Sequence, residues 1–184
     1  MSEQVVKIAD SWATPGALGL TGFSLSTIML GFVNMGIVED ALALIALSIF
    51  VGGLAQFCSG LMAFVKGSTF DMVAFTAFGA FWMSFAYILL SPVAISTLGL
   101  TIYLLIWGLL AGVMTLGVIK LKARALICVL GLLAVVFVLT AAGAFLASAT
   151  ISMIAGALTL ILGLVAFYTA MAITLNEVGF KLPL

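Results

Sequence analysis

Long apolar stretches dominate the chain, and short polar breaks separate them. None of these stretches contains Asp, Glu, Lys or Arg. A hydrocarbon core about 30 Å thick requires about 20 apolar residues per helix, and each stretch reaches that length. The pattern therefore predicts an all-α membrane protein with six transmembrane helices, at residues 18–38, 42–65, 72–91, 98–119, 125–147 and 151–175.

The positively charged residues all fall on one side of the predicted spans. Lys7 precedes the first span, and the others follow the second, fourth and sixth spans: Lys66, Lys120, Lys122, Arg124 and Lys181. Short loops rich in Lys and Arg remain cytoplasmic, so both chain ends are predicted to be cytoplasmic. This gives a cytoplasmic arm (1–17), which we expect to be retained and to form a surface helix, a six-helix transmembrane domain (18–176) and a short cytoplasmic tail (177–184).

Composition narrows the classes of function. Hydrophobic residues make up 66% of the chain and charged residues 7%, whereas a soluble domain has about 25% charged residues. The predicted partner is therefore the lipid bilayer, and the predicted location is the cell membrane. The chain has no His, and Cys58 and Cys128 are far apart, so the usual ligands and bases of metal sites and catalytic triads are missing. We therefore predict no enzyme activity, cofactor or metal. The formal net charge of 0 also gives no sign of a nucleic-acid partner, so we predict none.

The predicted spans thus have no Asp, Glu, Lys or Arg near the middle of the membrane. This argues against a proton path made of side chains, because such paths place ionisable groups near the middle of the membrane. Asp71 and Glu177 lie at span ends, where we expect solvated helix-end charges without a further role.

Two amide side chains stand out among the uncharged polar residues. Asn34 and Gln56 carry donors and acceptors that are costly to leave unpaired in lipid, so each is predicted to face a pore or another helix. Leu20 and Thr27 lie at seven-residue intervals before Asn34, which places all three on one face of the first helix. The hydroxyl of Tyr103 also requires a partner. For a single Ser or Thr, a hydrogen bond to a helix backbone is the alternative explanation.

Glycine and tryptophan positions indicate how the helices approach one another. Trp82 and Trp107 lie in the middle of their spans rather than at the membrane interface, which indicates burial between helices or subunits. Gly108 and Gly112 form a GxxxG pattern typical of close helix packing. At the start of the first span, residues 14–16 are expected to form a non-helical turn whose backbone N–H groups face an anion.

Four segments resemble those of a known family. TPGALGL at residues 14–20 is similar to the signature NPAPLGL, and GGLAQFCSGLMAFVKGSTF at 52–70 is similar to the blocks GGxAQxxAG and KGNTF. AFTAFGAFW at 74–82 is similar to AFTSYGSFW, and the chain ends with similar Tyr-x-Ala-Met and Leu-Asn-Glu elements. The sequence thus resembles the acetate uptake transporter family, also called GPR1/FUN34/YaaH, of acetate and succinate permeases.

The resemblance implies a homo-hexamer of six-helix protomers, each with its own pore for acetate and other small carboxylates. It places the family's hydrophobic constriction on Phe23, Phe78 and Leu133, and matches Ala166 to a small residue that bounds the pore. With the polar residues above, the predicted pore and substrate-binding residues are Thr14, Leu20, Thr27, Asn34, Gln56, Tyr103 and Ala166.

Three positions depart from the family pattern: Thr14 replaces Asn, Ala17 replaces Pro, and Phe78 replaces Tyr, which removes a hydroxyl from the constriction.

An apolar constriction is a costly place for a bare carboxylate. The substrate either crosses protonated, which gives proton-linked transport, or sheds water briefly as in a channel, and both alternatives stay open. A channel for another small anion or a neutral solute is the alternative function. A membrane enzyme finds little support, because the spans lack His, Asp, Glu and a Cys pair with a base nearby. A purely structural protein would not explain Asn34, Gln56 and the Thr-rich first span.

Overall fold

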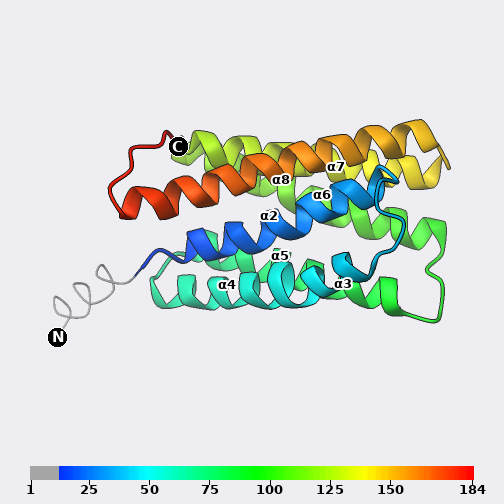
Figure 1. Ribbon diagram of the computed structural model, residues 1–184, viewed down its shortest axis with the longest axis horizontal. Coiled ribbons are helices and arrows are strands. Elements are labelled where there is room, and N and C mark those ends of the chain that lie inside the picture. Colours follow the sequence, from blue (N-terminus) through cyan, green and yellow to red (C-terminus); the bar gives the residue numbers. More distant parts are fainter. Residues whose placement is uncertain (1–12) are drawn as a thin grey trace.

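The structure is a computed structural model that describes residues 13–184. Its elements are α2 (Pro15–Asn34), α3 (Leu42–Ile49), the π-helical segment η1 (Phe50–Ala55), α4 (Gln56–Val65), α5 (Thr69–Leu90), α6 (Thr97–Leu121), α7 (Arg124–Phe145) and α8 (Ala149–Glu177) (Figure 1). α3, η1 and α4 together form one span, so the described residues contain six helices long and apolar enough to cross a membrane. This confirms the predicted fold class. Most of the predicted cytoplasmic arm lies outside the described residues.

The first helix begins earlier than the hydropathy pattern predicts. Thr14 is extended, with φ of −74° and ψ of 121°, and α2 starts at Pro15. Proline suits the first position of a helix because its φ is already helical and its missing N–H needs no partner there. The expected non-helical turn is therefore wrong for Pro15 and Gly16. α2 ends at Asn34, before Gly36, which has a positive φ of 71°.

Serine side chains define the starts of three later helices. The hydroxyl oxygens of Ser68, Ser96 and Ser148 accept hydrogen bonds from the backbone N–H groups of Asp71, Gly99 and Ile151, respectively. Each bond satisfies one backbone N–H that the helix itself leaves without a partner. These caps explain why the long apolar stretches are divided into separate helices with short connections.

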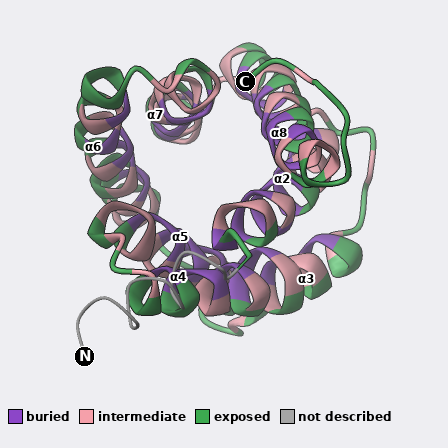
Figure 2. Cartoon of the chain, turned by 90° about the vertical axis from the view of Figure 1, so that its left-hand side faces the viewer, coloured by how far each residue is buried: buried purple, intermediate pink, exposed green. Residues whose placement is uncertain are grey.

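The spans form a ring when viewed along their length (Figure 2). α8 lies between α2 and α7, α6 packs against α7, and α4 packs against α5, while α2 also contacts η1 and α4. Short connections make consecutive spans antiparallel (Figure 1). This arrangement directs one face of each span toward a common axis.

Glycine allows α2 and α8 to approach with their backbones almost in contact. A Cβ atom on Gly31 would lie 2.7 Å from the backbone nitrogen of Leu160, and one on Gly163 would lie 2.8 Å from that of Ile28. These separations are shorter than real Cβ contacts, so no larger residue fits without moving a helix. The α2–α8 contact therefore fixes one side of the ring.

Large aromatic side chains fill the opposite seam, between α5 and α6. The ring of Phe81 lies 6.0 Å from that of Tyr103 and 5.3 Å from that of Trp107. The Tyr103 hydroxyl is 2.7 Å from the Ser84 hydroxyl across the same seam. Trp82 is 1% exposed, as its mid-span position predicts, whereas Trp107 is only half-buried.

The GxxxG pair does not form one packed face within the described chain. A Cβ atom on Gly108 would lie 3.1 Å from the Phe137 Cβ atom on α7, whereas one on Gly112 would meet no atom within 4 Å. The predicted burial is therefore confirmed for Gly108, whereas burial of Gly112 against another protomer stays a prediction. The two residues are one turn apart, and α7 passes close to only the first.

The described basic residues gather at one end of the ring, which we call the basic end: Lys66, Lys120, Lys122, Arg124 and Lys181. The opposite end carries Glu39 and Asp40 in the loop between α2 and α3. The placement of the basic end in the cytoplasm stays a prediction.

Cysteine labelling tests this orientation. In a variant without Cys58 and Cys128, Ala149→Cys at the opposite end should react with a membrane-impermeant maleimide in intact cells. Lys122→Cys at the basic end is the matched control and should react only after the cells are permeabilised. Both sites are exposed. The reverse pattern would show that the basic end faces outward.

Gly31→Ala should destabilise the protein by about 1 to 3 kcal/mol, because the added methyl group overpacks the α2–α8 contact. Thermal unfolding in detergent measures the effect. Gly131→Ala adds the same group where the nearest atom, Cγ2 of Thr115, lies 3.7 Å away, so its unfolding temperature should not fall. Equal stability of the two variants would contradict the described contact.

Candidate functional site

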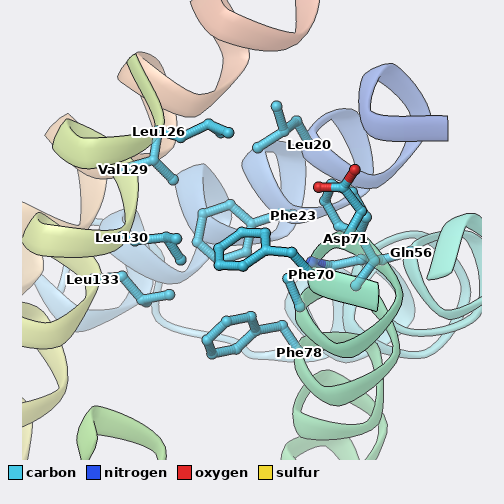
Figure 3. A pocket seen from close by; sticks show the side chains of 12 residues that line it. Leu20, Phe23, Gln56, Phe70, Asp71, Phe78, Leu126, Val129, Leu130 and Leu133 are labelled. Carbon is cyan, nitrogen blue, oxygen red and sulfur yellow. The ribbon is translucent and has the colours of Figure 1, made fainter. Parts of the chain in front are cut away.

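A narrow cavity of about 40 Å³ lies within the ring at the basic end. Its wall comes from α2, α4, α5 and α7 (Figure 3) and comprises Leu20, Phe23, Gln56, Phe70, Asp71, Ala74, Phe75, Phe78, Leu126, Val129, Leu130 and Leu133. Gln56 and Asp71 are the only members with polar side chains. We call this space the narrow cavity.

A second cavity, of about 230 Å³, lies toward the opposite end. We call it the wide cavity. α2, α5, α6, α7 and α8 contribute its lining, which comprises Phe23, Thr27, Leu30, Asn34, Phe81, Trp82, Phe85, Leu89, Leu100, Leu104, Leu133, Val136, Phe137, Thr140, Thr159 and Leu162. The wide cavity therefore has uncharged polar groups and no ionisable side chain.

Phe23 and Leu133 line both cavities and so mark the boundary between them. Both side chains are buried, at 4% and 5% exposure. The ring of Phe23 meets that of Trp82 edge-on, with 6.4 Å between centroids. Phe78 lines only the narrow cavity, and its ring lies 6.2 Å from that of Trp107. The boundary is therefore apolar and held by packed aromatic rings.

The hydroxyls in the wide cavity differ in what they can offer a ligand. Thr27 donates a 2.7 Å hydrogen bond to the carbonyl of Phe23, and Thr159 donates one of the same length to that of Ala155. Both hydroxyls can therefore only accept further hydrogen bonds. The side chains of Asn34 and Thr140 have no partner among the described residues, so their donors remain free for a ligand.

Gln56 occupies an unusual position in the narrow cavity. It is the first residue of α4, directly after η1, and is 2% exposed. Its Oε1 atom has no hydrogen-bond partner in the described chain. An unpaired buried acceptor is costly, and π-helical segments often occur at functional sites. Gln56 is therefore a candidate ligand-binding group.

Comparisons with known proteins agree with this architecture. A family model described as the GPR1/FUN34/yaaH family matches residues 4–180. The chain belongs to this family. It is 40% identical over 174 residues to the succinate-acetate/proton symporter SatP of Escherichia coli K12, covering 90% of each protein. It is also 37% identical over 83 residues to acetate permease A of Emericella nidulans, covering 44% of this chain and 28% of that protein.

A solved structure, described as the bacterial acetate channel SatP, has the same fold. The TM-score is 0.91 at 38% identity, and the match covers 95% of this chain and 99% of the other. This finding confirms the family that the sequence segments indicate. The protein is a multi-pass cell membrane protein, and its relatives are transporters or channels.

Most of the predicted pore residues line the narrow cavity or the wide cavity. Leu20 and Gln56 line the narrow cavity with Phe23, Phe78 and Leu133. Thr27 and Asn34 line the wide cavity.

Three predicted pore residues, Thr14, Tyr103 and Ala166, line neither cavity. Thr14 is exposed before the first turn of α2. Ala166 is fully buried within the helix packing. The hydroxyl of Tyr103 lies 2.7 Å from that of Ser84 and 3.3 Å from the carbonyl of Phe81, to which it donates, so it joins α5 to α6.

Asp71 and Thr140 are cavity residues that the sequence analysis did not select. Asp71 is partly buried and lines the narrow cavity, so the expectation of a solvated helix-end charge without a further role is incomplete. Thr140 interrupts an apolar run in α7, which is a weak signal for a pore position. Neither side chain could be assigned to a cavity without knowing which helices are neighbours.

Proposed function

We propose that this protein moves acetate and other small carboxylates across the cell membrane through a pore within each protomer. The observation that carries the proposal is the pair of cavities inside the ring, which meet at Phe23 and Leu133. Such an apolar boundary selects solutes by width and by the cost of removing their water. The names of the SatP proteins and of acetate permease A support acetate as the substrate.

The wide cavity is suited to collecting a carboxylate. The free donors of Asn34 and Thr140 can hydrogen-bond its oxygens, while the Leu and Phe side chains contact a short alkyl group. Phe23, Phe78 and Leu133 form the proposed constriction. We assign no catalytic residue, because the proposed process breaks no covalent bond.

We also propose that the protomers assemble as a homo-hexamer. Support comes from the family resemblance and from the apolar outer surface of α6, where Ile106, Leu109 and Val113 are exposed. The half-buried Trp107 borders the same surface. A neighbouring protomer would cover this aromatic ring as well as Gly112.

Uptake of radiolabelled acetate into proteoliposomes tests the proposed function. At neutral pH, uptake should exceed the passive uptake of protein-free vesicles measured in parallel, and an inwardly directed proton gradient should alter it if transport is proton-linked. Acetate uptake no faster than in protein-free vesicles would overturn the proposal. Uptake of a different small anion or a neutral solute by the same vesicles would then favour the alternative function.

Leu133→Ala should raise the ratio of lactate flux to acetate flux several-fold, because it widens the boundary between the two cavities. The substitution is expected to cost about 2 to 5 kcal/mol of stability, so each flux is normalised to folded protein. Leu44→Ala is the matched control, because Leu44 is 1% exposed and lines neither cavity. It should retain the wild-type ratio. An unchanged ratio in folded Leu133→Ala would remove Leu133 from the constriction.

A further inference from the structure

The narrow cavity holds an unusual group for a path that carries carboxylates. Asp71, in the first turn of α5, is the only charged side chain among its lining residues. No Lys or Arg of the described chain joins it there, although Lys66, Arg124 and Glu177 mark the ends of α4, α7 and α8 at the same end of the ring. Asp71 thus contributes a negative charge that no lining residue neutralises.

Helix capping explains only part of this arrangement. The Ser68 hydroxyl donates a 2.8 Å hydrogen bond to Oδ2 of Asp71 and accepts one from its backbone N–H. A carboxylate at this position also stabilises the positive end of the helix. Capping leaves Oδ1 without a partner in the described chain. It also does not require the side chain to line a cavity.

Gln56 supplies an independent second group. Its side chain is 2% exposed, and its Oε1 atom has no partner. In Figure 3, Gln56 and Asp71 lie on the same side of the cavity, across from Leu126, Val129 and Leu130. The polar side of the narrow cavity therefore offers the acceptor oxygens of the Asp71 carboxylate together with the N–H donors of one amide.

This combination discriminates between the two forms of a carboxylic acid. An ionised carboxylate has only acceptor atoms and would lie within a few ångströms of the Asp71 charge, which disfavours it by about tenfold or more in such a confined space. A neutral acid has one O–H donor for the Asp71 carboxylate. Its carbonyl oxygen can accept from the amide N–H of Gln56, so each polar group finds a partner.

We infer that Asp71 and Gln56 make the narrow cavity a binding site for the neutral, protonated form of the carboxylic acid. This inference rests on the proposed function and adds the chemical form in which the substrate passes. Each monocarboxylate carries its own proton on its own oxygen and releases it into water after leaving. No side chain takes up the proton, and no net charge crosses the membrane with the substrate.

The experiment measures charge moved per acetate in proteoliposomes, with electrical current and labelled uptake recorded on the same preparation. Protein-free vesicles give the passive uptake to subtract. The wild-type protein should move almost no charge per acetate. Asp71→Asn removes the charge, keeps the size of the side chain and replaces one acceptor oxygen with an N–H donor, so an anion is no longer repelled and charge per acetate should rise about tenfold.

Three matched variants separate charge at the cavity from other effects. Asp71→Glu keeps the charge, and Ser68→Ala removes the hydrogen bond to Asp71 but not the charge, so both should retain the wild-type ratio. Glu177→Gln makes the same charge change at the exposed end of α8, outside the cavity, and should also leave the ratio unchanged.

The outcomes distinguish this inference from the proposed function. Acetate uptake with a large current in the wild-type protein, or an unchanged ratio in folded Asp71→Asn, would overturn the inference while the proposed function stands. Uptake no faster than in protein-free vesicles would overturn both. A rise in charge per acetate in Asp71→Asn alone would support the neutral-acid site.

Discussion

The cost of placing charge inside a bilayer constrains every part of this chain. No Asp, Glu, Lys or Arg lies in the middle of a span, and the charged groups of the described chain lie in the first or last turns of helices, in loops or in the C-terminal tail. A path for a carboxylate must therefore use amides, hydroxyls and the packing of apolar rings. The two cavities use these components unequally, since the wide cavity has free donors at Asn34 and Thr140 while the boundary at Phe23 and Leu133 has none.

The π-helical segment shows how backbone packing positions a polar group in such a path. A Cβ atom on Gly52 would lie 2.5 Å from the Ser26 hydroxyl oxygen, and one on Gly53 would lie 2.7 Å from a side-chain carbon of Met83. η1 is therefore held closely between α2 and α5. Because Gln56 follows η1 directly, this packing sets the direction of its amide into the narrow cavity.

The sequence predicts the six spans well, because a bilayer requires long apolar helices whatever their neighbours are. The π-helical segment could not be predicted, because residues 50–55 are as apolar as a regular helix would be. The cavity positions of Phe23, Phe78 and Leu133 followed from the family resemblance. Asp71 and Thr140 were missed because a helix-end acid and a single Thr have ordinary explanations until the neighbouring helices are known. Tyr103 was selected for its hydroxyl, which Ser84 on the adjacent helix satisfies.

On the proposed mechanism, the boundary and the narrow cavity reject the same chemical species. The rings at Phe23 and Phe78 disfavour an anion because it must lose water there, and Asp71 disfavours it by repulsion. The wide cavity differs, because its free donors suit an ionised carboxylate as well as an acid. The substrate would therefore gain its proton before it reaches Phe23 and Leu133. A proton supplied from solution at that point explains how transport can be linked to protons in a chain that has no histidine and no carboxylate in the middle of any membrane span.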